Sequence, residues 1–123
     1  MSKRSSVVKP FIEDLEHTAA HILQFTAGTT ESDFSNNLMM QWSVIRGLEV
    51  LGEASKQLPD SLPDAEARFP NIPFKRMYAT RNRLIHGYST IELTTIWSIV
   101  QKQIPDVHVA TQAALANWPS DLS

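Results

Sequence analysis

The stretch 89-STIELTTIWSIVQKQIPDVHVATQAALANW-118 decides the fold of this 123-residue chain. Its apolar side chains recur every three or four residues, which places them along one face of an α-helix. They are Leu93, Trp97, Val100, Ile104, Val107, Ala114 and Trp118. The stripe keeps its face on both sides of Pro105, a residue that kinks helices. We therefore expect one kinked helix, or two helices stacked nearly end to end, opened by a Ser89-x-x-Glu92 capping box.

The same spacing predicts two helices near the start of the chain. The first begins at Pro10, which suits a first helical position, and runs to about Thr26. Its apolar face comprises Phe11, Leu15, Ile22 and Phe25. Residues 27–30 break it, and a second helix capped by Asp33 runs to about Gln57. The apolar side of this second helix is marked by Leu38, Trp42, Ile45 and Gly52.

A proline-rich connector follows, from Pro59 to Pro73, with one helical turn expected at about 64–68. A third helix begins near Pro73 and ends by Gly87, because glycine suits the left-handed turn after a helix. Four main helices joined by short connections predict an all-α, antiparallel four-helix bundle.

Length and composition restrict the class of protein. The chain suits a single domain over residues 1–123, with flexible ends at about 1–8 and 119–123. It has no cysteine, which excludes disulfide frameworks and thiolate chemistry. No apolar run approaches the ~20 residues of a membrane span, and no signal-peptide pattern follows the basic start. We therefore expect a cytoplasmic protein with no membrane contact.

Charge is unevenly distributed along the chain, although the formal net charge is only −2. Residues 67–91, the basic segment, contain no acidic residue and carry +5; the other residues, with 6 basic and 13 acidic side chains, carry −7. The basic residues of this segment are Arg68, Lys75, Arg76, Arg81 and Arg83. A basic island in an acidic protein is typical of a polyanion site. Equally open is a basic helix face that pairs with acidic neighbours elsewhere in the fold.

The chemically densest stretch is Arg81–Tyr88. Metal-free RNA cleavage needs a proton taken from the 2′-hydroxyl, a proton given to the 5′-oxygen, and stabilised phosphate charge. Histidine suits such proton transfers near neutral pH, and arginine offers a permanent charge with a planar donor fork. Asn82 and His86 share a helix face, so Asn82 can orient the imidazole or hold a phosphate oxygen. Arg81 and His86 lie roughly 140° apart around a helix axis, and converge if His86 sits in a fraying last turn.

The pattern Arg81-x4-His86-x-Tyr88 resembles the signature of the HEPN superfamily, specifically of HepT-like ribonuclease toxins. Those toxins are paired with minimal nucleotidyltransferase (MNT) antitoxins. Three further runs are similar to that family: Val44–Lys56, Asn71–Phe74 and Tyr88–Pro105. The resemblance covers roughly residues 10–108.

This resemblance implies a HEPN-like homodimer with the motif at its interface. It implies that Arg81 and His86 are the catalytic pair, supported by Asn82. The implied reaction is a metal-independent transesterification that leaves a cyclic phosphate and a 5′-hydroxyl, with no cofactor. Tyr88 is then the residue to which the MNT antitoxin attaches AMP. On the charge pattern, we expect contacts to the RNA backbone from Lys75, Arg76 and Arg83.

Rival functions stay open for this stretch. The same fold can bind RNA or a nucleotide without cutting it, and a third class is a purely structural or scaffolding helical protein. For Arg81 and His86 the simpler explanation is an ion pair or capping arrangement, since the helix dipole favours histidine at a helix C-terminus.

Polar residues elsewhere favour structural explanations. The first helix carries three residues spaced like metal ligands: Glu13, His17 and His21. Other polar residues lie close by, so we favour a solvated face, and we give His108 no role. A charged stripe on the second helix comprises Arg46, Glu49, Glu53 and Lys56.

We interpret this stripe as pairs within one helix, with a contact from Glu49 or Glu53 to Arg81 as the less favoured alternative. The tryptophans are assigned to the core or to a dimer contact: Trp42, Trp97 and Trp118.

Overall fold

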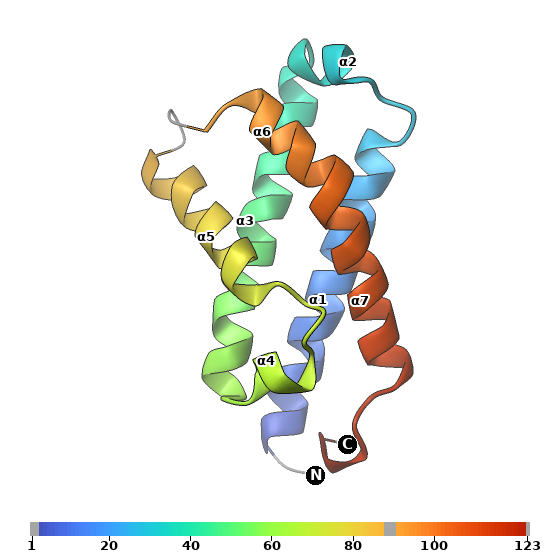
Figure 1. The fold of residues 1–123 in the computed structure, drawn as a ribbon, viewed down its shortest axis with the longest axis vertical. Coiled ribbons are helices and arrows are strands. Elements are labelled where there is room, and N and C mark those ends of the chain that lie inside the picture. The colour runs from blue at the N-terminus through green and yellow to red at the C-terminus, as the bar shows by residue number, and fades with distance from the viewer. Residues whose placement is uncertain (1–2, 88–90, 123) are drawn as a thin grey trace.

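The computed structural model describes residues 3–87 and 91–122, with side chains from residue 8 onward. Every element in these ranges is helical, in the arrangement of Figure 1. The elements are α1 (Lys3–Thr26), α2 (Glu31–Ser35), α3 (Leu38–Ser61), α4 (Ala65–Arg68), α5 (Phe74–Gly87), α6 (Leu93–Ser98), the π-helical turn η2 (Ile99–Gln103), α7 (Ile104–Ala116) and the 3-10 turn η3 (Ser120–Leu122). The prediction of an all-α bundle is confirmed.

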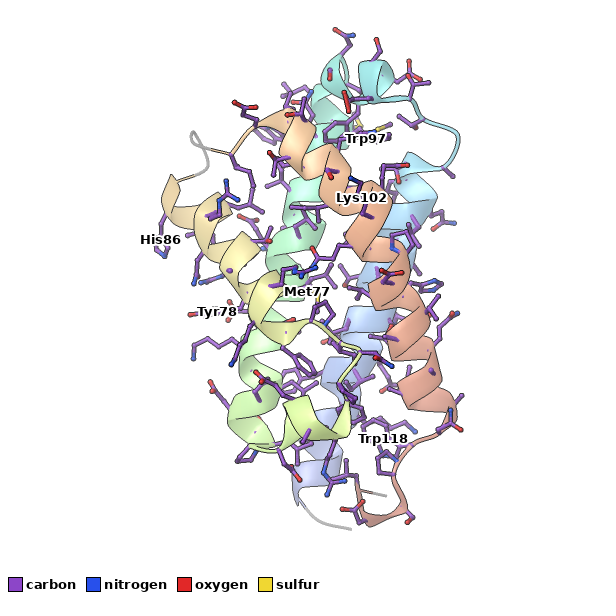
Figure 2. All side chains as sticks on the ribbon, viewed as in Figure 1. Met77, Tyr78, His86, Trp97, Lys102 and Trp118 are labelled. Atoms are coloured by element: carbon purple, nitrogen blue, oxygen red, sulfur yellow. The ribbon has the colours of Figure 1, made fainter. Side chains whose placement is uncertain are left out.

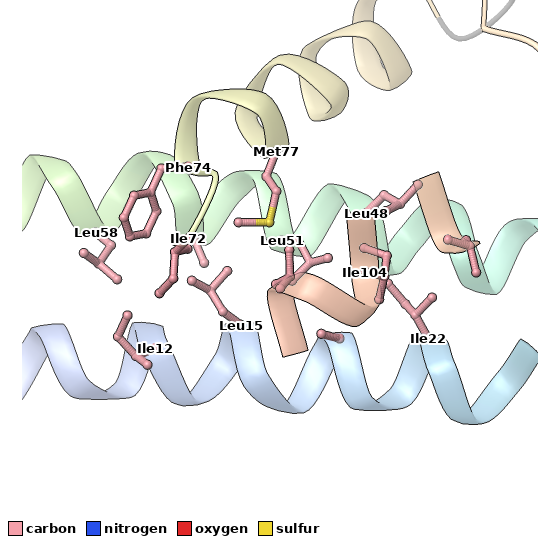
Figure 3. Close-up of a cluster of buried hydrophobic side chains, with 14 of the residues drawn as sticks. Ile12, Leu15, Ile22, Leu48, Leu51, Leu58, Ile72, Phe74, Met77 and Ile104 are labelled. Atoms are coloured by element: carbon pink, nitrogen blue, oxygen red, sulfur yellow. The ribbon is translucent and has the colours of Figure 1, made fainter. Parts of the chain in front are cut away.

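The two longest helices, α1 and α3, lie side by side and run in opposite directions (Figure 1). α5 packs across α3, and α6, η2 and α7 form one rod, of which α7 packs along α1 and α6 packs on α2. Figure 3 shows Ile12 of α1 facing Leu58 of α3, and Leu15 pointing toward the same layer as Leu51, with Met77 of α5 above Leu51. Burying one such side chain stabilises the fold by about 1.5–3 kcal/mol. These contacts fix the position of α5 on α3.

The last stretch forms the predicted continuous rod, with a wide π-helical turn just before Pro105. The Ile104 N–H donates to the carbonyl of Ile99, five residues earlier, and so changes the register beside a proline that lacks an N–H. The apolar stripe stays buried at Trp97, Val100, Ile104 and Val107. The expectation of one kinked or stacked helix through the proline is confirmed.

The predicted start of this rod is wrong. α6 begins at Leu93, and its N-cap is Glu92, in extended backbone and without a side-chain capping bond. The predicted cap, Ser89, lies among residues 88–90, outside the described ranges. Ile91, just before the cap, is buried and forms a bend, and the helix begins only after the extended Glu92.

Helix α1 begins at Lys3, so the start predicted at Pro10 is wrong and Pro10 lies inside the helix. An interior proline costs about 3 kcal/mol because it removes a helical hydrogen bond. Val8 and Ile12 flank it and are fully buried, and their burial offsets that cost. Of the ends expected to be flexible, residues 3–8 lie in α1 and residues 120–122 form η3, with Leu122 buried; their flexibility stays a prediction.

The predicted second helix is divided into α2 and α3. At the start of α2, Thr30 accepts from the Asp33 N–H at 3.1 Å, and Asp33 accepts from the Thr30 N–H at 3.2 Å. Asp33 is therefore the N3 residue of a capping box whose N-cap is Thr30, rather than the cap itself. A second cap, Asn37, accepts from the Met40 N–H at 3.0 Å and starts α3. Two caps seven residues apart explain why one predicted helix is two.

Helix α3 continues through Pro59 to Ser61, past the end predicted at Gln57. After it, α4 forms the helical turn expected at about 64–68, and α5 has the expected bounds. Across the described part of the chain, none of the helices combines the length and apolarity that spanning a membrane requires.

Large apolar side chains are exposed where α1 ends and α3 begins. They are Phe25, Leu38, Met39 and Trp42, which are 50%, 64%, 80% and 69% exposed. Phe25 and Leu38, expected on apolar helix faces, therefore lie outside the core, and of the two assignments of Trp42 the core is wrong while the dimer contact stays a prediction. The core takes the stripe of α3 through Val44, roughly 200° around the axis from Trp42. With Ser43 and Arg46, the exposed side chains line an open apolar hollow of about 660 Å³.

Candidate functional site

Helix α5 presents the residues predicted to carry the chemistry. It anchors itself with three buried apolar side chains: Phe74, Met77 and Leu84. Arg81 and Asn82 are half-buried, and His86 is exposed. Figure 2 shows His86 at the outer edge of α5, pointing away from the bundle. The three residues of the predicted site therefore differ in how far they are enclosed.

Helices α5 and α3 approach closely at Gly52. A Cβ atom on Gly52 would stand 2.1 Å from the Cβ of Arg81 and 2.8 Å from the carbonyl oxygen of Met77. No side chain fits there without moving one helix, so glycine is required for this crossing. The first carbon of the Arg81 side chain rests on the backbone of α3, and the fold fixes where the arginine leaves α5.

The guanidinium of Arg81 has a partner on each of its terminal nitrogens. Nη1 donates to Oδ1 of Asn82 at 3.0 Å, and Nη2 forms an ion pair with Oε2 of Glu53 at 3.1 Å. The other oxygen of Glu53 accepts from Gln57, one turn further along α3, at 3.5 Å. The contact from Glu53 to Arg81, the less favoured alternative from sequence, is therefore correct. Asn82 contacts the arginine, a role that sequence reasoning did not give it.

Arg81 lies between two concave surfaces, and lines both. The inner cleft, between α3 and α5, has a volume of about 350 Å³ and is lined mainly by polar residues, among them Asp14, Arg46, Glu49 and Glu53. The outer hollow, of about 490 Å³, is lined by Tyr78, Arg81, Asn82, Arg83, His86 and Gly87. The structure thus brings Arg81, Asn82 and His86 to one surface, as the motif predicts.

Tyr78 is a member of the outer hollow that sequence reasoning missed. It is half-buried and lies on the same side of α5 as His86 (Figure 2). The sequence spacing could have identified it, because residues 78, 82 and 86 are four apart and share a helix face. A phenol ring in this hollow offers a surface for stacking a base.

The basic segment is divided between structural and unpaired cations. Arg68 donates hydrogen bonds to Asp121 and Asp64, and these bonds, the one to Asp121 first, raise the pKa of Arg68. Lys75 lies 3.7 Å from Glu66. In the described ranges, two exposed arginines of the segment form no ion pair: Arg76 and Arg83. Pairing with acidic neighbours, the alternative from sequence, therefore applies to part of the segment and leaves these two arginines for a polyanion.

The other candidate residues have structural surroundings. Glu16 joins α1 to α7 through His108, at 3.3 Å, and also lies 3.5 Å from His17. His21 stacks on Phe25. Among the described residues, no group of three or more His, Cys, Asp or Glu side chains is placed to hold a metal ion.

The aromatic residues singled out in the sequence differ in their surroundings. Trp97 is a core residue that packs on Phe34, and Trp118 is half-buried against Phe69. Trp42 is exposed in the apolar hollow. Tyr88, the predicted modification site, lies outside the described ranges.

Comparison with known proteins places this site in context. A family model described as ribonuclease HepT-like matches residues 15–114. A protein of Methanocaldococcus jannaschii named "Putative RNase MJ1380" is 39% identical over 107 residues, covering 87% of this chain and 94% of that protein. "Probable ribonuclease HepT" of Thermococcus cleftensis is 34% identical over 99 residues, covering 80% and 87%. No solved structure matches the chain significantly.

Proposed function

This chain belongs to the ribonuclease HepT-like family, and on this premise we propose that it is an endoribonuclease, the toxin of a toxin–antitoxin pair. The 2′-oxygen of one nucleotide attacks the adjacent phosphorus, and the bond from phosphorus to the 5′-oxygen breaks. The products carry a 2′,3′-cyclic phosphate and a 5′-hydroxyl. The reaction needs no metal, because the protein's own side chains supply the proton transfers and the positive charge.

We assign each step to a residue of the outer hollow. His86 transfers protons, because imidazole both accepts and donates a proton near neutral pH. Arg81 stabilises the charge that develops on the phosphate oxygens, using N–H groups that Asn82 and Glu53 leave available. Asn82 supports catalysis by holding Nη1 of that guanidinium. Arg83, with Arg76 and Lys75, contacts the RNA backbone around the site.

The observation that carries the proposal is the shared hollow of Arg81, Asn82 and His86. The structural explanation for these residues predicts a histidine bonded at the helix end. In the described ranges, however, no hydrogen bond or ion pair of the His86 side chain occurs, and the imidazole is exposed. An exposed imidazole beside a fixed guanidinium favours a substrate site over a structural one.

The enzyme is tested with purified protein and single-stranded RNA in the presence of EDTA. We expect cleavage with cyclic-phosphate ends, and none in His86→Ala, which should still bind RNA. His17→Ala, which removes an exposed histidine from α1, is the matched control and should cleave normally. A His86→Ala variant that cleaves normally would remove the histidine from the mechanism. RNA binding without cleavage by wild type would favour the non-catalytic binding module, and chelator-sensitive cleavage would indicate a metallonuclease.

We further propose that the active form is a homodimer. A two-step proton transfer needs an acid and a base, and the motif holds one histidine per chain. Arg46 lines both the apolar hollow and the inner cleft that contains Arg81. The apolar hollow therefore adjoins the cleft that contains Arg81. In a symmetric dimer the same surface of both copies forms the interface, so a second copy that covers this hollow would lie close to the motif.

Control by an MNT-type antitoxin through Tyr88 completes the proposal. An adenylate on this tyrosine would add a negative phosphate two residues from His86 and compete with RNA for Arg81. Co-expression with the cognate nucleotidyltransferase should add the mass of one AMP to wild type and none to Tyr88→Phe. If wild type gains no mass and both variants are silenced equally, control is by binding alone.

A further inference from the structure

We propose that Glu53 is a positioning residue for Arg81: its carboxylate on α3 holds the guanidinium so that its remaining donors face the outer hollow. This inference rests on the proposed function, since it gives Arg81 a phosphate to bind. It adds a residue from a second helix to a site that the sequence motif confines to α5.

The stem of Arg81 is fixed first, by the helix crossing. The 2.1 Å that would separate a Gly52 Cβ from the Arg81 Cβ leaves no space between the stem and the backbone of α3. The conformation of the rest of the side chain then decides where the charge lies. Glu53 follows Gly52 directly in α3, so the crossing that seats the stem also brings a carboxylate to the guanidinium.

The head of Arg81 is fixed next, by acceptors on two helices. Asn82 from α5 holds Nη1 at 3.0 Å, and Glu53 from α3 faces Nη2 at 3.1 Å. Contacts at both terminal nitrogens set the plane of the guanidinium, which one contact alone leaves free to rotate. A guanidinium has five N–H donors, so the Nε–H and the second hydrogens of the terminal nitrogens remain for phosphate oxygens.

Glu53 is itself held in place, as a positioning residue must be. Its Oε1 accepts from Nε2 of Gln57 at 3.5 Å while its Oε2 faces Arg81. The side chain of Arg81 is 24% exposed, against 48% for Glu53, so the arginine is the more enclosed partner. Gln57, Glu53, Arg81 and Asn82 form one continuous chain of contacts from α3 to α5. Such a chain reduces the reorganisation needed when the phosphate charge develops.

The contact between Glu53 and Arg81 has a second interpretation, which predicts the opposite effect of removing Glu53. A carboxylate beside Arg81 can compete with the RNA phosphate for the guanidinium, in which case removing Glu53 would strengthen RNA binding and cleavage. Positioning predicts instead that removal lowers kcat, because a guanidinium displaced by about 1 Å loses on the order of a hundredfold in rate. The two interpretations are separated by the direction of the change.

The test compares steady-state RNA cleavage by Glu53→Ala, Glu53→Gln and wild type. We expect Glu53→Ala to lower kcat roughly tenfold to a hundredfold with a smaller change in KM. Glu53→Gln keeps an oxygen acceptor and should recover part of that loss. Glu49→Gln, which changes a carboxylate of the same inner cleft that pairs with Arg46, is the matched control and should leave kcat unchanged. In an Arg81→Ala background, removing Glu53 should cause no further loss.

Higher activity in Glu53→Ala, or equal loss in Glu49→Gln, would overturn the inference while the proposed function stands. If Arg81→Ala itself cleaves RNA normally, the proposed function fails instead. The contact has a readout independent of catalysis, the NMR signal of the Arg81 Nη2–H group, which faces Glu53. Glu53→Ala should speed its exchange with water and Glu49→Gln should not, and equal exchange in both would also overturn the inference.

Discussion

Arg81 and His86 lie on one helix and in one hollow, yet the fold treats them differently. Arg81 has its stem against Gly52 and both terminal nitrogens engaged. His86 lies in the last turn of α5, exposed and pointing outward (Figure 2). The position of the arginine is determined within the monomer. On the proposed function, RNA or a second copy of the chain would complete the surroundings of the histidine.

The difference teaches which part of such a site is preorganised. A charge that must already be in place when the phosphate becomes crowded benefits from rigid support. A group that must accept and then release a proton benefits from access to solvent and to its partner. The contrast is therefore consistent with the roles proposed for the two residues, and variants of either residue can test it.

The largest effects are expected from the two residues themselves. His86→Ala should lower the cleavage rate by about 10²–10⁴-fold, the usual contribution of a proton-transfer group. Arg81→Lys keeps the charge but should still lose roughly 10²–10³-fold, because an ammonium cannot replace the planar fork held by Asn82 and Glu53. Single-turnover cleavage at saturating RNA measures both losses.

Thermal melting then tests whether the two residues differ in support. Arg81→Ala should lower the melting temperature slightly. The loss in free energy of unfolding should be no more than about 1 kcal/mol, because the ion pair is partly exposed. His86→Ala should leave it unchanged. Equal destabilisation in both variants would contradict the comparison, since His86 would then be as firmly held as Arg81.

A further prediction concerns the place where the Arg81 side chain rests on α3. Gly52→Ala should destabilise the protein by about 1–3 kcal/mol, because its Cβ would meet the Arg81 Cβ and the Met77 carbonyl. Gly47→Ala is the comparison: the atoms nearest its Cβ would be Cδ1 and Cγ1 of the buried Ile22, both at 2.8 Å, which are side-chain and not backbone atoms, so it should destabilise the protein less. Chemical denaturation compares the two. If Gly52→Ala were as stable as Gly47→Ala, glycine would not be required where α3 and α5 cross.

Much of this fold could be predicted from the sequence, because periodic burial dominates helical bundles. The continuous rod through Pro105 followed from apolar spacing, and the bounds of α5 followed from Pro73 and Gly87. Local capping was harder, since Asn37 and Thr30 compete with Asp33 for the same role and only the packed structure selects between them. The second apolar stripe of α3, through Trp42, could not be recognised as exposed because spacing does not say which stripe the core uses.

The site was predictable along one helix and not across two. The members on α5, Arg81, Asn82 and His86, share a short motif and are found by spacing. The support from α3 depends on how two helices cross, which the sequence encodes only as a glycine followed by a glutamate. Tyr78 was missed because it precedes the motif, although it lies on the helix face that continues from Asn82 and His86.

Another prediction tests whether a second copy of the chain completes the surroundings of His86. Trp42→Ser removes an aromatic anchor from the apolar hollow and should weaken self-association by about 2 kcal/mol, the size of an interface hot spot. Cleavage should become dependent on protein concentration. Val109→Ser, at a residue 64% exposed on α7 and outside that hollow, is the control. Sedimentation at micromolar concentration decides, and a fully active Trp42→Ser monomer would contradict the dimer.

The smallest expected effect concerns the cations around the two residues. Arg76 and Arg83 are exposed and have no ion pair in the described ranges, whereas Lys75 lies 3.7 Å from Glu66. For single-stranded RNA, each phosphate that the protein neutralises adds about 0.7 to the steepness with which log affinity falls against log salt. Arg83→Gln and Arg76→Gln should each reduce the slope by roughly this amount.

Lys75→Gln is the internal comparison and should reduce the slope less, because Glu66 already offsets part of the charge of Lys75. RNA affinity measured from low to physiological salt gives all three slopes. The substitutions should weaken binding without lowering the cleavage rate at saturating RNA, since they leave the Arg81 contacts and His86 in place. If the three slopes fall equally, the ion pair with Glu66 does not matter in solution and all three residues contact RNA. If none changes, RNA does not bind along this face of α5, and the outer hollow must be reached from the side of the inner cleft.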